Sequence, residues 1–349
     1  MGIQFELIDI DTDTEWNDFV KSHPSGKIYH HTFWGRVLYQ SFGYQPFYFM
    51  IADPSSHQIL GIFPSMIQKS LFRKDRIISL PLTGYCPCLI QKEHFNNCIE
   101  YLHRFQNHKS AIELKCDRQM TELDEQYSET CHYINHTIKL NVDKETFYRS
   151  ILNKSCRRKI KKATEKEMQF KLADSMDGVH AFYSLFASSR KKKGLPILPF
   201  AFFENMWKIL SPEKMMMVPV IEYQGKIIAA DILLNYKDTL YSEYSASDTR
   251  YFPYGVNQKM LWELVCFGLR EKKNFIDLGR SRLSNTSLIE FKKKWNTRAD
   301  YLYYYYHPDQ SREKIRHSRS LYNFALWIHK RFPVKLLEFE GKFIYRYFG

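Results

Sequence analysis

Residues 214–307 alternate strand-like and helical patterns in an order that few folds accommodate. The segment begins with three strand-like runs separated by short turn signals, at residues 214–223, 226–235 and 239–247. Because such short connections join neighbouring strands, these runs predict an antiparallel meander. A helical pattern, an apolar strand, a shorter helix and an aromatic strand follow, with the longer helix at 255–273 and the strands at 274–278 and 301–307.

The N-terminal half shows the same order of strands and helices without sequence similarity to the C-terminal half. Its strand-like runs lie at 47–53, 58–68, 76–82, 111–116 and 133–141, and its helical run lies at 92–106. A chain of 349 residues is long enough for two domains that each bury a core. We therefore predict two related domains, residues 1–143 and 144–308, followed by a basic, aromatic and helical tail at 309–349.

The composition is that of a globular protein with a polyanionic partner. The chain is 44% apolar and 26% charged, and its formal net charge is +13. This charge favours nucleic acid, an anionic membrane face or a phosphate-bearing substrate, and it does not choose among them. No apolar run reaches membrane-spanning length and the first residues do not resemble a signal peptide, so we expect a cytoplasmic protein.

Several chemistries lack their sequence motifs. The 7 cysteines include no C-x-x-C pair, so we expect no disulfide framework and no metal. The Walker A, Rossmann glycine, G-x-S-x-G and H-E-x-x-H patterns are missing from the sequence. Nucleotide hydrolysis, hydride transfer and two hydrolytic mechanisms therefore lose support. No residue pattern suggests a covalent nucleophile.

The strand at 274–278 carries polar residues to its carboxyl end, where open α/β layers tend to place ligands. Gly279 permits a turn or the close approach of a ligand, and Arg280 offers a planar fork of donors for phosphate or carboxylate. Asp277 is either a residue of such a site or a cap or turn residue.

Three lysines follow Phe291 in a short helical stretch, at positions 292, 293 and 294. Since neighbouring residues of a helix point about 100° apart, only one of the three can reach a given pocket. Lys292 either belongs to a solvated basic face or points inward as a cation over a developing oxyanion.

Two other segments carry clusters of cations. The helical run at 182–196 ends in four consecutive cations, of which Arg190 lies nearest the packed face. Residues 144–168 form a predicted helical run after the domain boundary. Arg158 belongs to a basic stripe at 157–162 of this run that would contact phosphate, and we assign it to substrate binding. Solvated helix faces are the alternative interpretation of both segments.

Five segments, taken in order, resemble the FemAB/FemX family of peptidyltransferases and the FemAB-related acetyltransferase-domain proteins of the GNAT superfamily. They are LNKSCRRKIKKATEKEMQF, FYSLFASSRKKKGLP, GKIIAADILLNYKDTLYSEYSAS, GVNQKMLWELVCFGLREKKNFIDLGRS and LIEFKKKWN. The resemblance implies an α/β (α+β) chain of two tandem GNAT-like domains, each a mixed, largely antiparallel sheet flanked by helices. It also implies acyl or aminoacyl transfer to a primary amine, without a metal, a bound cofactor or a covalent enzyme intermediate. The co-substrate would be aminoacyl-tRNA or acyl-CoA.

The family's Phe-Lys motif matches Phe291-Lys292, so the resemblance implies that Lys292 stabilises negative charge on the carbonyl oxygen of the donor. The attacking amine must lose a proton before it is nucleophilic, and a carboxylate or water would accept that proton. Asp277 and Asp231 are the carboxylates in the segments that resemble the family and are the candidates for this proton acceptor. We favour Asp277 because we expect it to end a strand.

The resemblance assigns four further residues to substrate binding. Arg190 falls where the family places an arginine that grips acceptor phosphate, and Arg280 would bind the donor or the acceptor. Tyr244 and Asn257 would line the cleft, with a core tyrosine and a helix cap as the alternatives.

The sequence departs from the family in lacking the coiled-coil arm of some Fem enzymes and the usual GNAT pyrophosphate loop. Its tail at 326–349 resembles that of FemAB-related proteins of exopolysaccharide systems. We expect an N-acyltransferase acting on a cell-envelope, peptidoglycan or exopolysaccharide precursor, with a phosphate-bearing sugar, a muropeptide or a lipid-linked molecule as acceptor. The alternatives are a small-molecule acyl-CoA-dependent N-acetyltransferase and a non-catalytic tRNA- or membrane-binding module. In the tail, Leu321, Phe324, Ala325 and Ile328 share one helical face, and Pro333 ends that helix. This amphipathic tail either docks on the body or holds the protein at the inner membrane face.

Overall fold

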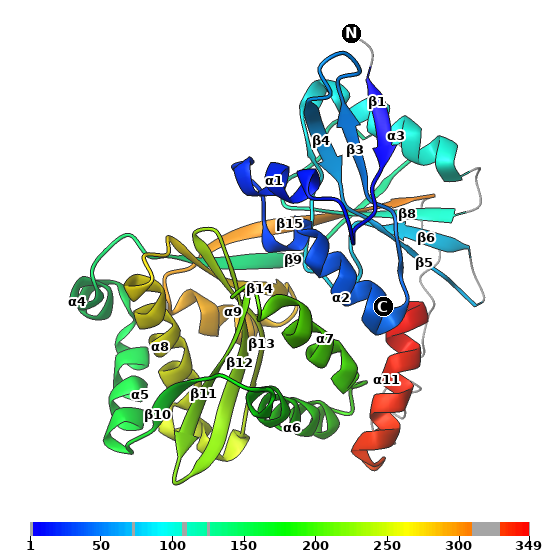
Figure 1. The fold of residues 1–349 in the computed structure, drawn as a ribbon. Helices are drawn as coiled ribbons and strands as arrows, with labels where there is room; N and C mark the ends of the chain where they lie inside the picture. Colours follow the sequence, from blue (N-terminus) through cyan, green and yellow to red (C-terminus); the bar gives the residue numbers. More distant parts are fainter. Residues whose placement is uncertain (1–2, 72–73, 107–109, 124–125, 309–328, 349) are drawn as a thin grey trace. The chain divides into compact units, whose positions relative to one another are not determined.

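The computed structural model describes residues 3–71, 74–106, 110–123, 126–308 and 329–348 (Figure 1). The chain divides into two compact units. The first comprises Met1–Tyr133, Tyr301–His317 and Lys342–Gly349, and the second comprises Ile134–Asp300 and Ser318–Gly341. These limits differ from the predicted domain limits because two strands, β9 (Ser128–Lys139) and β15 (Arg298–His307), each begin in one unit and end in the other.

The first unit contains two sheets, one of order β1-β3-β4-β7 and one in which β15, β8, β6, β5 and β2 follow one another. Its elements are β1 (Gln4–Leu7), α1 (Glu15–Ser22), η1 (Ile28–His30), α2 (Thr32–Phe42), β2 (Gln45–Pro46), β3 (Phe49–Ala52), β4 (Ile59–Phe63), β5 (Met66–Gln68), β6 (Asp75–Ile78), β7 (Leu89–Ile90), α3 (Lys92–Gln106) and β8 (Ser110–Cys116). Its core is rich in stacked rings, such as Phe49 on Phe63 with centroids 5.0 Å apart. Aromatic side chains therefore supply much of the buried area of this unit.

The second unit is built on a sheet of order β10-β11-β12-β13-β14-β9. Its elements are α4 (Lys144–Thr146), the π-helical turn η2 (Phe147–Ile151), α5 (Lys154–Glu165), β10 (Gln169–Ala173), α6 (Met176–Lys193), α7 (Phe200–Leu210), β11 (Met216–Tyr223), β12 (Lys226–Tyr236), β13 (Thr239–Ser247), η3 (Thr249–Tyr254), α8 (Val256–Arg270), β14 (Phe275–Arg282) and α9 (Thr286–Lys293). Strands β10 to β13 pair antiparallel, and β13 pairs with β14 in parallel. The predicted meander is thereby confirmed.

Helices cover both faces of the second unit's sheet (Figure 1). Helices α5 and α8 pack together on one face, where Ile160, Leu264 and Ile276 belong to one buried apolar cluster. Helices α6 and α7 cover the other face and bury Phe182 and Phe203. The predicted class, largely antiparallel sheets flanked by helices, is confirmed in both units.

Two predicted elements are divided in the structure. The single strand predicted at 58–68 is wrong, because Pro64, which has no N–H for a ladder, separates β4 from β5 and the two join different sheets. The helical run predicted at 144–168 is interrupted before α5. There the side chain of Asn153 accepts the N–H of Ser155 at 2.9 Å and starts a new helix.

The described part of the tail is a turn at 329–333 followed by α11 (Val334–Phe348). The helical face predicted from Leu321, Phe324, Ala325 and Ile328 lies outside the described residues. Pro333 directly precedes α11, a position where its missing N–H does not interrupt the hydrogen bonds of the helix. Among the described helices, none is long and apolar enough to cross a bilayer.

Candidate active site

The parallel strands β13 and β14 stop pairing part of the way along. Their paired residues are Thr239–Phe275, Leu240–Ile276 and Tyr241–Asp277. Both strands continue, β13 to Ser247 and β14 to Arg282, with no further pair between them in the described residues. Backbone groups on the facing edges beyond this point are therefore not used by the β13–β14 ladder. Such edges suit an extended ligand that can pair with a strand.

Charged side chains form hydrogen bonds with both the N–H and the carbonyl of Gly279 in β14. Its φ of 68° lies in the left-handed region, which glycine adopts without the steric cost that a Cβ would add. Asp277 Oδ1 accepts the Gly279 N–H at 2.7 Å. Lys292 Nζ donates to the carbonyls of Leu278 and Gly279 at 2.7 and 2.9 Å. Since an ammonium has three N–H donors, one donor of Lys292 remains beyond these two bonds.

Lys292 is the lysine of its helix that points inward. Its side chain is buried, whereas Lys293 and Lys294 are exposed, as the helical geometry of α9 predicts. Burial lowers the pKa of Lys292 to about 8, and the negative charges of Asp277 and Glu243 oppose that shift. At pH 7 the ammonium form therefore still predominates by about ten to one. The site presents a buried cation.

Asp277 has both carboxylate oxygens engaged. Besides the bond to Gly279, its Oδ2 accepts the Nδ2 of Asn135 on β9 at 3.0 Å. The same asparagine keeps a buried Oδ1 that has no hydrogen-bond partner among the described residues. Asp277 is thus both a turn residue, which the sequence left open, and part of the polar cluster around Lys292.

His136, next to Asn135 on β9, adds a neutral polar group to this cluster. Its Nδ1 lies 3.1 Å from Thr297 Oγ1. Burial, together with the positive charges of Lys292 and Lys293, lowers the pKa of His136 to about 4. The imidazole is therefore uncharged at physiological pH. Sequence reasoning missed both residues, since a lone Asn-His pair within a strand carries no motif.

A second buried carboxylate, Asp231 of β12, lies beside the bulge of β13. Its Oδ2 accepts hydrogen bonds from the hydroxyls of Ser242, at 2.7 Å, and Ser245. Burial raises the pKa of Asp231 to about 7, with Glu243 adding to the rise and the two serines opposing it. Within the described residues, Asp231 Oδ1 has no hydrogen-bond partner. Ser245 is exposed, so its hydroxyl connects this buried acid to the surface.

Glu243 connects the two charged groups electrostatically. The pairing of β12 with β13 passes from Ile232–Tyr244 to Leu233–Ser242, so Glu243 is the extra residue of a β-bulge. Its charge acts on both Lys292 and Asp231. No sequence pattern pointed to Glu243, because a bulge is visible only once the strands are paired.

Tyr244 and Arg190 come together through an aromatic cluster between β13 and the helices α6 and α7. The Tyr244 ring lies edge-on to Phe203, with centroids 5.3 Å apart, and to Phe186 at 6.3 Å. The Arg190 guanidinium lies 5.9 Å from the Phe186 centroid, and its Nε donates to the Pro196 carbonyl at 2.9 Å. Tyr244 is therefore partly a packing residue, as its alternative interpretation held.

The three remaining predicted residues are more dispersed. Arg280 is half-buried and follows Gly279 directly, so it belongs to the Lys292 cluster by position. Asn257 accepts the Ser247 hydroxyl at 2.7 Å, at the carboxyl end of β13. The N-cap of α8 is Gly255, so Asn257 does not fill the cap role that was its alternative. Arg158 lies on the exposed face of α5.

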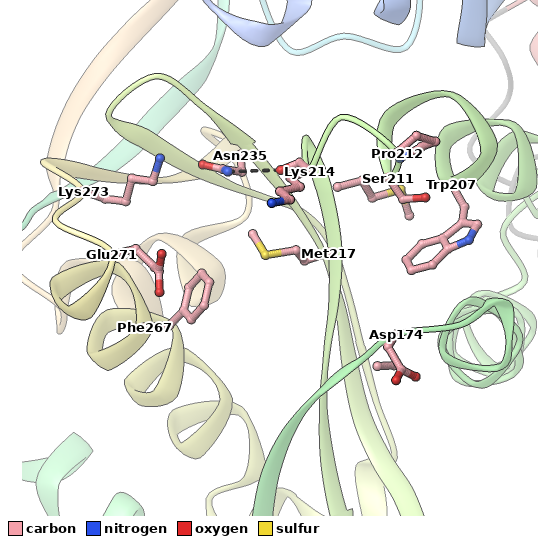
Figure 2. A pocket seen from close by; sticks show the side chains of 12 residues that line it. Asp174, Trp207, Ser211, Pro212, Lys214, Met217, Asn235, Phe267, Glu271 and Lys273 are labelled. Carbon is pink, nitrogen blue, oxygen red and sulfur yellow. Dashed lines mark hydrogen bonds between the residues drawn. The ribbon is translucent and has the colours of Figure 1, made fainter.

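A hollow of about 500 Å³ lies elsewhere in the second unit (Figure 2). Its lining includes Trp207 of α7, Phe267 of α8 and Asn235 of β12, and Figure 2 shows the hydrogen bond from Asn235 to the Lys214 carbonyl. It also reaches Lys273, just before β14 begins. The Lys292 cluster lies at Asp277–Gly279, where pairing with β13 stops but β14 continues to Arg282, so the prediction that Asp277 ends its strand is wrong. None of the predicted site residues lines this hollow.

The comparisons with known proteins agree with this architecture. Residues 152–293 match the family model described as an acetyltransferase (GNAT) domain. Among solved structures, FemX is 13% identical and has a TM-score of 0.68, over 89% of this chain and 99% of that chain. The C-terminal domain of a protein described as a lysylphosphatidylglycerol synthetase, from Agrobacterium fabrum, is 12% identical with a TM-score of 0.55, over 84% and 90%. A tandem GNAT protein from the clavulanic acid biosynthesis pathway is 7% identical with a TM-score of 0.55, over 87% and 98%.

These matches define the class of the protein. Residues 152–293 of the second unit match the GNAT domain model, and 89% of the chain shares the fold of FemX, as the resemblance in its sequence predicts. The protein is therefore an acyltransferase by class. No curated protein sequence matches the chain.

Proposed function

We propose that the second unit transfers an acyl or aminoacyl group to a primary amine of a cell-envelope, peptidoglycan or exopolysaccharide precursor. The observation that carries this proposal is the early end of β13–β14 pairing, with the Lys292 ammonium bound to the carbonyls of β14 just beyond it. An extended donor would pair with the strand edges there and bring its ester or thioester carbonyl to the remaining N–H of Lys292.

The transfer itself needs no covalent intermediate with the enzyme. The amine nitrogen attacks the carbonyl carbon, a C–N bond forms, and the C–O bond of an ester or the C–S bond of a thioester breaks. Negative charge gathers on the carbonyl oxygen during the attack. Lys292 would stabilise it, since a fixed cation in a buried site interacts more strongly with a developing charge than with the neutral ground state. The leaving alcohol or thiol takes up a proton.

The proton of the amine needs an acceptor, and the contacts favour Asp231 over Asp277. Both oxygens of Asp277 are already engaged. Asp231 combines a pKa of about 7 with the exposed hydroxyl of Ser245 as a proton path. A base whose pKa is near the working pH is the most effective, because it is often deprotonated and still accepts a proton readily. Asp277 then orients Gly279.

The acceptor is proposed to carry phosphate, as a lipid-linked or sugar precursor does. The net charge of +13 favours such a molecule. Arg190 and Arg280 are the proposed phosphate contacts, with Arg158 as a more distant one, because a guanidinium binds phosphate through two parallel hydrogen bonds. One structural relative is described as a lysylphosphatidylglycerol synthetase, so the same fold occurs in a protein named for a phospholipid product.

A small-molecule acyl-CoA-dependent N-acetyltransferase is the second candidate. The same end of β13–β14 pairing favours it, since the long arm of coenzyme A is an extended chain with amide groups that can pair with a strand edge. Under this alternative the acceptor would be a free amine, and the basic surface would have another partner.

The test compares both donors on the intact protein. Gel shifts with aminoacylated and deacylated total tRNA are run beside thermal melts with coenzyme A and acetyl-CoA, because a ligand selective for the native state raises the melting temperature. Transfer is then measured as release of labelled amino acid from tRNA, or of free thiol from acyl-CoA, with an envelope-precursor extract as acceptor. Donor binding and amine-dependent release support the proposal. Binding of neither donor, or release that does not depend on Lys292, contradicts it.

A further inference from the structure

The outer face of α11 combines three exposed apolar side chains with a row of cations. Leu336, Phe339 and Phe343 are 45%, 73% and 48% exposed. Their spacing of three and four residues puts them on one stripe of the helix. Lys335, Lys342 and Arg346 are exposed and spaced by seven and four residues, which makes a second stripe beside the first.

The opposite face of α11 is fixed to the protein body. Leu337 is fully buried, and a Cβ on Gly341 would collide with the Ile197 carbonyl. The Glu338 carboxylate accepts the Phe200 N–H at 2.8 Å. The apolar stripe is therefore presented outward by a helix that is held in place, and it is not exposed through fraying.

The acidic residues of the helix are directed to partners other than the cationic row. Glu338 is engaged with the Phe200 N–H, and Glu340 pairs with His329 at 3.0 Å. Lys330 in the turn before α11 is exposed as well. The outward surface of this segment is thus basic and apolar together, like that of a helix that lies in a membrane interface.

We propose that α11 docks the protein on an anionic lipid bilayer, with Leu336, Phe339 and Phe343 entering the interface and the cationic row contacting lipid phosphates. Charge decides the choice of partner. In a symmetric contact between two copies of this helix, the same cationic rows would be brought together, which is unfavourable. An anionic bilayer offers both an apolar layer and the opposite charge, and the net charge of +13 favours its approach. This inference does not depend on the proposed transfer reaction.

The experiment is flotation of the full chain with vesicles of phosphatidylcholine alone and of phosphatidylcholine with about one third phosphatidylglycerol, at low and high salt. We expect strong partitioning only to the anionic vesicles, with about a fivefold loss for each cation removed by Lys335→Gln or Lys342→Gln. The double variant Phe339→Ser/Phe343→Ser is expected to lose about tenfold or more, because each phenylalanine buries a large apolar area.

Matched controls use residues of the same types elsewhere. Phe252→Ser removes a phenylalanine that is 44% exposed, and Lys226→Gln removes an exposed cation of β12. Both are expected to float like the unaltered protein, and circular dichroism checks that every variant folds. Equal flotation of the unaltered protein and the double variant would overturn the proposal. So would a dimer, seen by light scattering, that the double variant abolishes while vesicle binding is unchanged.

Discussion

Asp277 and Lys292 act on the same residue, Gly279, from its two peptide groups. The Asp277 carboxylate accepts the glycine N–H at 2.7 Å, and the Lys292 ammonium donates to the glycine carbonyl at 2.9 Å. The left-handed backbone of β14 at this point is thereby fixed by two opposite charges that also attract each other. The proposed catalytic cation and the shape of the strand edge are consequently one structural unit.

Replacement of Lys292 by methionine keeps the length and apolar stem of the side chain and removes its charge. We expect the turnover number to fall by about 10²–10³-fold, as when an oxyanion donor is lost, while acceptor KM changes little. Lys293→Met, an exposed neighbour on the same helix, is the control and should retain turnover. Steady-state kinetics with the donor that binds would decide, and equal rates for the two variants would exclude the role of Lys292.

The pH dependence of kcat/KM should be bell-shaped. The active form needs Asp231 without its proton and Lys292 with its proton. With pKa values of about 7 for Asp231 and about 8 for Lys292, activity rises through the first value and falls through the second. In Lys292→Arg the guanidinium stays charged, so any residual activity should lose the alkaline limb. An unchanged alkaline limb in that variant would assign it to another group.

Relative to the unaltered protein, Asp231→Asn should be more stable at alkaline pH than at acidic pH. The pKa of Asp231 is raised from 3.8 to about 7 on folding, so the unaltered protein has its full free energy of unfolding below pH 3.8 and loses part of it as the pH rises to 7. The loss is about 4 kcal/mol at most. Asparagine has no such titration. Melting temperatures of both proteins at pH 5 and pH 8 test this, and a difference between them that does not depend on pH would contradict it.

Comparing Gly279→Ala with Gly225→Ala separates the stability cost of backbone strain from the effect on the candidate site, because only Gly279 lies in that site. The two glycines have φ of 68° and 70°, and a Cβ at either would meet nothing within 4 Å. Each substitution should therefore cost about 1–2 kcal/mol through the backbone alone. Only Gly279→Ala should also reduce donor binding and turnover, because it moves the carbonyl that Lys292 holds. Equal activity of the two variants at matched stability would refute this.

Much of the second unit could be predicted from local sequence. The spacing of apolar residues and the turns at 224–225 and 236–238 predicted the meander, because neighbouring strands joined by short turns have few ways to pair. Helical geometry alone showed that only one of the three lysines at 292–294 could point inward. The motif around Phe291 indicated which one, and burial of Lys292 agrees with it.

The remaining features depend on contacts between residues distant in the chain. Asn135 and His136 reach the Lys292 cluster because β9 lies beside β14, more than a hundred residues later in the sequence. Glu243 stands out only through the bulge that pairing with β12 creates. The raised pKa of Asp231 follows from burial, which a lone Asp in an apolar strand does not reveal.

By itself, the sequence determined the order of strands and helices, the basic character of the protein and the residue types from which a site could be made. Tertiary structure decided which of these residues meet. Arg158 stays on an exposed helix face, whereas Asp277, Lys292 and Asn135 converge on the part of β14 where its pairing with β13 stops. The physical reason is that side-chain pattern fixes local backbone geometry, while burial, pKa and hydrogen bonding depend on what packs against each residue from elsewhere in the chain.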